Sequence, residues 1–243
     1  MCTLSWLPDR SGYWVFFNRD ERRTRRPGRA PVHHRLGTVR MVAPVDGDFG
    51  GTWIGVNQFA VTAALLNRYH DAPAERTPAT VSRGLLLRSL LEARSGRGLI
   101  GRLSKTGLKN YLPFTIAAFD RSATVRVADW NGRELVVSRV TKPGLVRTSS
   151  GFDQRAAERA RQARFDSALL AGPITAPALR SLHRDHHPGK GPLSVCMHRP
   201  DARTQSLTEI RVAATTASVR YRAGSPCRAR ASQPIRLSLA HRG

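Results

Sequence analysis

The sequence predicts an α+β fold whose strands pair mainly in antiparallel fashion. Short apolar runs are joined by hairpin-length turns more often than by crossover helices, which favours antiparallel sheets. The clearest turn is Asn131-Gly132, because this dipeptide favours the two-residue turn of a β-hairpin. The longest helical segment, 153–170, lies among strand-like segments. Helices and strands are therefore expected to share one mixed domain.

The first part of the chain is expected to be mostly strand. Turn residues 8–12 separate two apolar runs and predict an N-terminal hairpin. The segment 22–37, rich in Arg, Pro and His, is expected to be a loop, as is the glycine-rich segment 47–51. Strands are expected at 3–7, 13–18, 38–45, 53–57 and 60–67.

Helices are expected in three places. One begins at Pro78, because the leucines between positions 85 and 91 follow the spacing of a core-facing helix. The others cover 153–170, capped by Asp153, and 175–183, capped by Thr175. The glycine-rich segment 96–107 is compatible with a short helix or a loop. Further strands are expected at 114–119, 124–130, 135–140, 193–198, 207–213 and 218–222.

We expect a single domain over residues 2–223, because no linker is long enough to divide it. Residues 224–243 are expected to form a polar, basic tail that is partly ordered.

The chain is strongly cationic. It has 243 residues, with 40 Lys and Arg against 17 Asp and Glu, and a formal net charge of +23. Proteins that bind nucleic acid usually gather their cations on one face, whereas these arginines occur throughout the chain. Aromatic residues that stack on RNA bases are not interleaved with the densest cluster, 19–29. We therefore expect a solvated cationic surface and no nucleic-acid partner. The alternative is a surface with affinity for polyanions or acidic membranes.

The sequence predicts a cytoplasmic protein. No apolar run approaches the roughly 18 residues of a membrane span, and the first residues lack the features of a signal peptide. The three cysteines, Cys2, Cys196 and Cys227, do not suggest a disulfide framework.

Cys2 is the first candidate for chemistry. Removal of Met1 leaves Cys2 with a free α-amine, whose pKa of about 7.7–8.0 keeps part of it unprotonated at neutral pH. One residue then supplies both a thiol nucleophile and a base. The alternative is a small buried hydrophobic residue.

Arg19 and Asp20 are expected to lie near Cys2, because hairpin pairing places the start of the first strand beside the end of the second. A guanidinium lowers a thiol pKa or binds a carboxylate, and a carboxylate holds an ammonium group. The alternative is a surface ion pair of little energetic value.

Three motifs now resemble a known family. They are Cys2-Thr3, Asn18-Arg19-Asp20-Glu21 followed by Arg26-Pro27, and the run from Gly50 to Asn57. In order and spacing they resemble the NRDE family, which is the transport and Golgi organisation protein 2 family, over most of residues 2–213. That family is similar to N-terminal nucleophile amidohydrolases. The resemblance implies a four-layer αββα sandwich with two mainly antiparallel sheets.

The resemblance also implies a site. Cys2 corresponds to the nucleophile, with Arg19 and Asp20 as its partners. Asn67 corresponds to an oxyanion-hole amide, although it also suits a strand-ending turn, and Arg203 corresponds to an arginine beside the nucleophile. The implied reaction is hydrolysis of a non-peptide C–N amide bond in a small amide or acyl substrate, without cofactor or metal.

This sequence departs from the family pattern at three places. Phe59 stands where many relatives have Gly, Ser149 lies where hydrolases often have Asn, and Arg203 is not within a Thr-Arg-Ser run. A second reading therefore stays open. It is a non-catalytic haem- or lipid-binding or trafficking protein on the same scaffold, with Cys2 or a His touching haem iron.

Other polar groups are expected to have no chemical role. The histidines within 183–187, together with Cys196 and His198, have a spacing that matches no zinc signature, so solvated polar residues are expected there. Cys196 is expected in the core. His33-His34 is expected to be a loop pair, and the glycines within 47–51 do not form a phosphate-binding loop.

Overall fold

Two antiparallel sheets form the centre of the molecule. The computed structural model describes residues 2–69, 80–122 and 124–240. One sheet has the strand order β10-β1-β2-β11-β12-β13 and the other β3-β4-β5-β6-β7-β8-β9. The first sheet comprises β1 (Cys2–Asp9), β2 (Gly12–Arg22), β10 (Gly144–Ser149), β11 (Ala202–Val212), β12 (Thr216–Ala223) and β13 (Ile235–Ser238). The second comprises β3 (Arg29–Leu36), β4 (Val39–Val45), β5 (Ile54–Asn57), β6 (Thr62–Asn67), β7 (Phe114–Phe119), β8 (Val125–Trp130) and β9 (Leu135–Val140).

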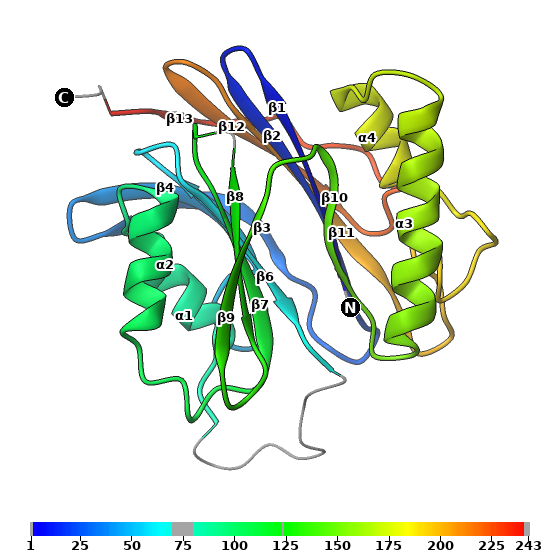
Figure 1. The fold of residues 1–243 in the computed structure, drawn as a ribbon, viewed down its shortest axis with the longest axis horizontal. Helices are drawn as coiled ribbons and strands as arrows, with labels where there is room; N and C mark the ends of the chain where they lie inside the picture. Colours follow the sequence, from blue (N-terminus) through cyan, green and yellow to red (C-terminus); the bar gives the residue numbers. More distant parts are fainter. Residues whose placement is uncertain (1, 70–79, 123, 241–243) are drawn as a thin grey trace.

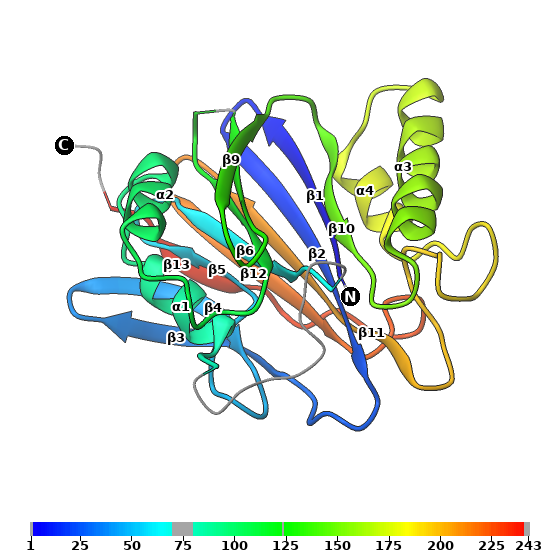
Figure 2. The same ribbon diagram turned by 60° about the horizontal axis from the view of Figure 1, so that its bottom comes forward.

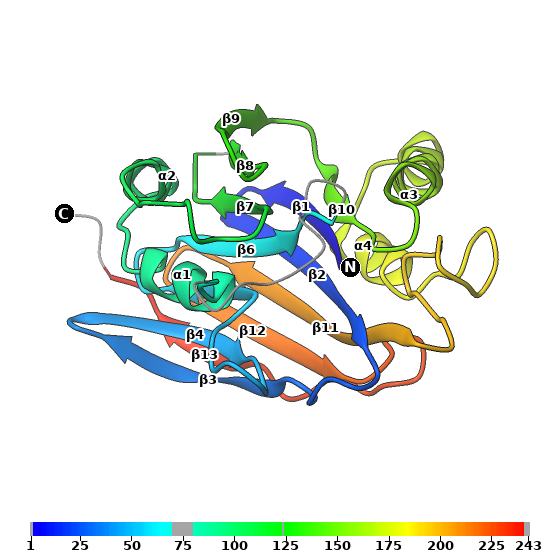
Figure 3. The same cartoon turned by 90° about the horizontal axis from the view of Figure 1, so that it is seen from below.

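Helices cover the outer face of each sheet. α1 (Arg83–Leu90) and α2 (Gly96–Ser104) pack on the seven-stranded sheet, and α3 (Gln154–Leu170) and α4 (Ala176–Leu182) pack on the six-stranded sheet. The two helix pairs therefore lie at opposite sides of the molecule with both sheets between them (Figure 1). The same order of layers is seen from below in Figure 3. The four-layer αββα sandwich is confirmed.

Each interface between layers has its own apolar core. Alternate residues of the strands, such as Leu4, Phe17 and Val56, fill the space between the two sheets. The leucines of α1 and α2 pack on Phe114 and the outer face of the seven-stranded sheet. Phe165 of α3 packs with residues of the other sheet's outer face. The strands are therefore buried on both faces. A chain of this size can bury such a core without a covalent cross-link.

Tyr13 connects the two sheets through a hydrogen bond. Its hydroxyl lies 2.8 Å from the carbonyl oxygen of Ala60, in the turn between β5 and β6, and 3.0 Å from Oγ1 of Thr62 on β6 of the second sheet. The aromatic body of Tyr13 meanwhile belongs to the core between the sheets. A buried hydroxyl with these partners fixes how one sheet lies on the other.

The motif around Asn57 shapes the second sheet. The Asn57 side chain donates to the carbonyl oxygens of Leu91 and Ala93, each at 2.7 Å, and so holds the C-terminal end of α1. Upstream, Gly51 passes the backbone of Gly84 so closely that a Cβ on it would lie 2.4 Å from the Gly84 carbonyl carbon. Glycine at position 51 therefore allows α1 to start against this loop.

Most predicted elements are found, two predictions are wrong, and one strand has no counterpart among the predictions. Residues 22–37 are not a loop throughout, because they include β3, an edge strand with basic side chains on its exposed face. The predicted strand 193–198 is irregular, with only an isolated bridge between His198 and Arg203. β10 was not predicted at all. Its residues pair with β1.

The start of the first helix and the extent of the C-terminal tail can also be compared with the expectations. The expected helix start at Pro78 lies outside the described residues, and α1 begins after Ser82, whose side chain accepts from the backbone N–H of Leu85. Within the tail 224–243, β13 pairs with β12 and buries Leu237, so this part of the tail belongs to the sheet. Among the described residues, no helix combines the length and the apolar character needed to cross a membrane.

Candidate functional site

The β1–β2 hairpin brings the predicted residues together. Cys2 lies opposite Arg19 of β2 and, on its other side, opposite Ser149 of β10. The N-terminal end of β1 lies beside β10 and β2, as Figure 2 shows. Directly opposed residues of antiparallel strands point to the same face. The Cys2 side chain therefore faces the core between the sheets, where it is buried.

A pocket opens at this end of the hairpin. It has a volume of about 200 Å³ and is bounded by residues of β1, β2, β6 and the loops that precede α1 and β7. Four of the five predicted site residues line it, namely Cys2, Arg19, Asp20 and Asn67. Its remaining wall is mixed, with aromatic residues such as Phe49 and Trp53 beside the charged residues Glu21 and Arg25. The pocket therefore offers both apolar and charged contacts to a small ligand.

Arg19 is held in place by Asp46, Trp53 and Glu21, whose Oε2 lies 3.5 Å from Nη2 of Arg19. Its Nη2 lies 2.8 Å from Oδ2 of Asp46, and its guanidinium lies over the Trp53 ring with its central carbon 4.5 Å from the ring centroid. Arg25 also binds Asp46 and Glu21, with nitrogen–oxygen distances of 2.9 and 2.8 Å. The two arginines share the carboxylates of Glu21 and Asp46 and form a network at the pocket wall. This network holds Arg19 more firmly than an isolated surface ion pair would.

Asp20 lies on the opposite face of β2 from Arg19 and is almost fully buried. Its Oδ1 accepts from the Thr204 hydroxyl at 2.5 Å, and its Oδ2 lies 3.4 Å from Nη2 of Arg161. Burial raises the pKa of the Asp20 carboxyl, and the Arg161 guanidinium and the Thr204 hydroxyl oppose that rise.

Arg161 is a site residue that the sequence analysis missed. It is fully buried on α3, and its Nη1 donates to the carbonyl oxygen of Cys2 at 3.3 Å and to the hydroxyls of Thr3 and Thr148 at 2.8 and 2.7 Å. One guanidinium thus holds both Asp20 and the backbone of Cys2. The sequence feature that indicates its burial is its spacing, because Arg161 lies midway between the buried residues Ala157 and Phe165 on the inward face of the helix.

Asn18, the first residue of the second motif, is structural. Its side-chain nitrogen donates to the carbonyl oxygens of His183 and Val195, both at 2.9 Å. Its oxygen is left to accept from Nδ1 of His183 at 3.0 Å, so Nε2 of that ring accepts from the Ser5 hydroxyl at 2.7 Å. Burial, followed by the nearby Arg161 charge, lowers the pKa of His183 to about 3.

The buried Cys2 thiol resists ionisation. Burial raises its pKa, and the Asp20 carboxylate adds to the rise, while the backbone N–H of Asp20 and the Arg19 guanidinium oppose it. The thiol therefore needs a nearby proton acceptor before it can act as a nucleophile at neutral pH.

Asn67 ends β6 and lines the same pocket. Its side-chain nitrogen lies 3.1 Å from the Tyr69 hydroxyl, to which it donates. An amide at this place can donate to the oxygen of a carbonyl held in the pocket. Ser149, opposite Cys2, has a buried hydroxyl with no hydrogen-bond partner among the described residues.

Arg203 does not join the other predicted residues. It is exposed, lies opposite Glu21 in the β2–β11 pairing and is absent from the described lining of the pocket. The β11 register shifts between Thr204 and Ser206, and Thr204 rather than Arg203 is the neighbour that binds Asp20.

The residues that were expected to be solvated around 183–187 are placed differently. His183 is fully buried, so that expectation is wrong for it. His186 and His198 meet Cys196 and Cys227 in a separate cluster of side chains. Cys196 is buried, as expected, whereas His33 and His34 lie on strand β3 and not in a loop.

Comparisons with known proteins agree with this fold. The chain is similar to the N-acylethanolamine-hydrolyzing acid amidase ortholog of Caenorhabditis elegans, with a TM-score of 0.60 and 9% identity over 86% of this chain and 92% of that one. It is similar to a mutant conjugated bile acid hydrolase from Clostridium perfringens, with a TM-score of 0.57 and 11% identity over 100% and 97% of the two chains. It is also similar to penicillin V acylase from Agrobacterium tumefaciens, with a TM-score of 0.54 and 12% identity over 90% of this chain and 82% of that one.

At these low sequence identities the similarity concerns the fold alone. The search of curated proteins found no match to the sequence. The sequence model of the family described as Transport and Golgi organisation 2 matches residues 1–164, which include Cys2, Arg19, Asp20, Asn67 and Arg161. The match covers more than half of the 243 residues and confirms the resemblance drawn from the motifs. This chain therefore belongs to the Transport and Golgi organisation 2 family.

Proposed function

We propose that this protein is an N-terminal nucleophile amidohydrolase that cleaves a non-peptide C–N amide bond, with Cys2 as the nucleophile after Met1 is removed. The observation that carries the proposal is the position of the Cys2 thiol. It lies at the wall of a pocket, beside Arg19 and the Asp20 backbone, and Asn67 lines the same pocket.

The first step needs a base, because the buried thiol has a raised pKa. The free α-amine of Cys2 takes the thiol proton, and the sulfur attacks the substrate carbonyl carbon. The negative charge that develops on the carbonyl oxygen is held by the Asn67 side-chain N–H and a backbone N–H. A donor of this kind typically contributes roughly 3–4 kcal/mol to lowering the barrier.

The second step returns the proton. The ammonium group of Cys2 protonates the leaving nitrogen, the C–N bond breaks, and an acyl thioester remains on the sulfur. The same amine then takes a proton from water, the hydroxide attacks the thioester, and the acid leaves as the thiol is restored. The bonds and protons balance without a cofactor.

The surrounding charges have separate tasks in this mechanism. Asp20 stabilises the ammonium form of the Cys2 amine, and Arg161 keeps Asp20 and the Cys2 carbonyl in position. Arg19, fixed by Asp46 and Trp53, faces the bound substrate. The mixed pocket wall favours an amphipathic acyl group, with its apolar part against Phe49 and Trp53.

The test is turnover of a panel of fluorogenic N-acyl amides by protein whose intact mass shows that Met1 is absent. Cys2→Ala is expected to lower turnover at least about 1,000-fold, because the nucleophile is lost. Mass spectrometry of wild-type protein quenched during turnover should find the acyl group on the Cys2 peptide.

A second protein separates the thiol from the amine. A short uncleavable extension before Cys2 keeps the thiol but removes the free α-amine, and it should abolish turnover as completely as Cys2→Ala. The same extension at the carboxyl end is the matched control and should leave turnover unchanged. Wild-type turnover by the Cys2→Ala protein removes Cys2 from the mechanism, and wild-type turnover by the N-terminally extended protein removes its α-amine as the base.

A further inference from the structure

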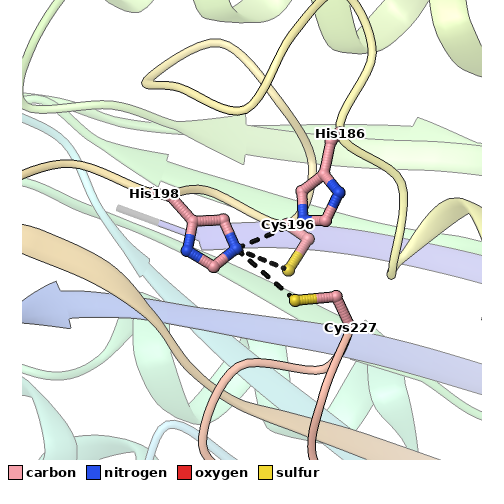
Figure 4. Close-up of side chains that lie close together, drawn as sticks. All are labelled: His186, Cys196, His198 and Cys227. Carbon is pink, nitrogen blue, oxygen red and sulfur yellow. Dashed lines mark hydrogen bonds between the residues drawn. The ribbon is translucent and has the colours of Figure 1, made fainter.

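Four metal-ligating side chains converge away from the pocket. His186, Cys196, His198 and Cys227 each point one donor atom toward a common centre (Figure 4), and these four atoms all lie within 4.8 Å of one another. Nε2 of His198 lies 3.2 Å from Nε2 of His186 and 3.6 and 3.5 Å from the sulfurs of Cys196 and Cys227. Both cysteines are free thiols.

These separations match a tetrahedral ion. With Zn–N of about 2.0–2.1 Å and Zn–S of about 2.3 Å, tetrahedral geometry places two nitrogens about 3.3 Å apart and a nitrogen and a sulfur about 3.6 Å apart. The nitrogen–nitrogen distance of 3.2 Å and the nitrogen–sulfur distances of 3.5 and 3.6 Å are close to those values.

Hydrogen bonds alone do not explain the arrangement. A ring nitrogen carries one proton or one lone pair, so Nε2 of His198 can make one good hydrogen bond and not three. Three groups nevertheless crowd that single atom. A cation between the four donors satisfies all of their lone pairs at once, and this donor set of two thiolates and two imidazoles suits Zn²⁺.

We propose that His186, Cys196, His198 and Cys227 bind one Zn²⁺ ion in a structural site. All four positions of a tetrahedral ion are then taken by protein ligands, which leaves no open position for a substrate and distinguishes the site from a catalytic one. The order His-Cys-His-Cys along the chain, with Cys227 far from the others, explains why no zinc signature is visible in the sequence.

The site lies where the fold lacks regular structure. Residues 183–201 contain no helix and no strand, yet Val195, Cys196 and Met197 are fully buried. Cys227 comes from the irregular segment between β12 and β13. An ion would tie these two segments together where no ladder of backbone hydrogen bonds does so.

The proposed zinc site also reaches the candidate active site. Met197, between two of the ligands, donates its backbone N–H to the Thr204 hydroxyl oxygen at 2.8 Å, and the Thr204 hydroxyl donates to Asp20. Through this chain of contacts, zinc would fix the loop that supports Asp20 without touching a substrate.

The first test is metal content. Protein without a polyhistidine tag, purified without chelators, is analysed by inductively coupled plasma mass spectrometry and should hold about one zinc per chain. Less than about a tenth of an equivalent, after incubation with excess Zn²⁺ and gel filtration, overturns the proposal. So does a disulfide between Cys196 and Cys227 in metal-free, freshly purified protein.

The second test identifies the ligands by Co²⁺ titration of the metal-free protein. We expect the visible absorption of four-coordinate Co²⁺ and a near-ultraviolet thiolate-to-metal band. Cys196→Ser and Cys227→Ser should each weaken the thiolate band, whereas Cys2→Ala and the exposed-site variant His33→Ala are matched controls that keep it. Loss of the band in Cys2→Ala instead places the ion elsewhere and overturns the assignment.

The third test remains informative even if the ligand variants fail to fold. Wild-type protein stripped by a chelator should unfold at a lower temperature, and equimolar Zn²⁺, but not Mg²⁺, should restore the original midpoint. Identical midpoints with and without Zn²⁺ overturn the structural role.

Discussion

Arg161 connects Asp20 with the backbone of Cys2 and with the side chains of neighbouring strands. Its guanidinium contacts Asp20, the Cys2 carbonyl and two threonine hydroxyls in a fully buried position. Arg161→Met is expected to lower the free energy of unfolding by about 3–5 kcal/mol, because it leaves Asp20 buried without its charge partner. Urea denaturation measures the change. Arg159→Met, at an exposed position of the same helix, is the control and should stay within about 0.5 kcal/mol of wild type. An equal loss in both variants contradicts this role for Arg161.

His183 makes the stability depend on pH. The folded protein keeps its ring neutral down to a pKa of about 3, whereas in the unfolded chain it takes up a proton near pH 6.5. Below pH 6.5 the unfolded state binds more protons, so stability is lost as the pH falls. Between pH 7 and 4.5 this group should cost wild-type protein about 2–3 kcal/mol.

Urea midpoints at the two pH values test this effect in His183→Gln, which should lose that part of the pH dependence. The exposed-site variant His33→Gln should retain it. A wild-type slope in His183→Gln would show that other groups cause the loss of stability.

The predictable part of the site is the part formed by local pairing. Cys2, Arg19 and Asp20 come together through one hairpin, whose turn is visible in the sequence. Arg161 and Thr204 reach Asp20 from distant elements, and the position of Arg203 depends on a register shift within β11. The family resemblance places Arg203 beside the nucleophile, whereas the structure places it opposite Glu21 and outside the described lining of the pocket.

Among the elements, β13 shows that the basic C-terminal segment takes part in folding. It pairs with β12, and Leu237 inserts into the core between the sheets. Leu237→Ala is expected to lower the free energy of unfolding by about 2–5 kcal/mol through lost burial and a cavity. Leu170→Ala, at a side chain that is 89% exposed, serves as the control and should change it by less than about 0.5 kcal/mol. Thermal or urea unfolding decides the matter, and a Leu237→Ala protein as stable as the control contradicts the pairing of β13 with the sheet.

The elements that the sequence reveals are those with a strong local signal. The helix 153–170 has a cap and a buried face, and the Asn131-Gly132 turn joins β8 to β9. β3 lacks a strand pattern because it is an exposed, basic edge strand. Residues 193–198 have the apolar character of a strand, but their backbone groups bond to scattered partners such as Asp185, Gly191 and Thr204 and form no ladder. Burial without a strand partner is a tertiary property that a linear pattern does not encode.

At the scale of the whole molecule, the layer order followed from the family resemblance and not from the pattern of elements. The six-stranded sheet places β1 and β2 between β10 and β11, which come from the other half of the chain. Pairings over such separations depend on the complete set of tertiary contacts. The two asparagines of the motifs, Asn18 and Asn57, hold loops on either side of the sandwich, which gives both residues a structural role without any chemistry.

This strand order has a consequence for synthesis on the ribosome. The β1–β2 hairpin emerges before the strands that flank it, and both of its edges stay unpaired until β10 and then β11 have been translated. At ordinary elongation rates the wait for β11 is on the order of 10–40 s. During that interval an apolar two-stranded ribbon exposes free backbone donors and acceptors on both sides, which is the kind of surface that nascent-chain chaperones cover.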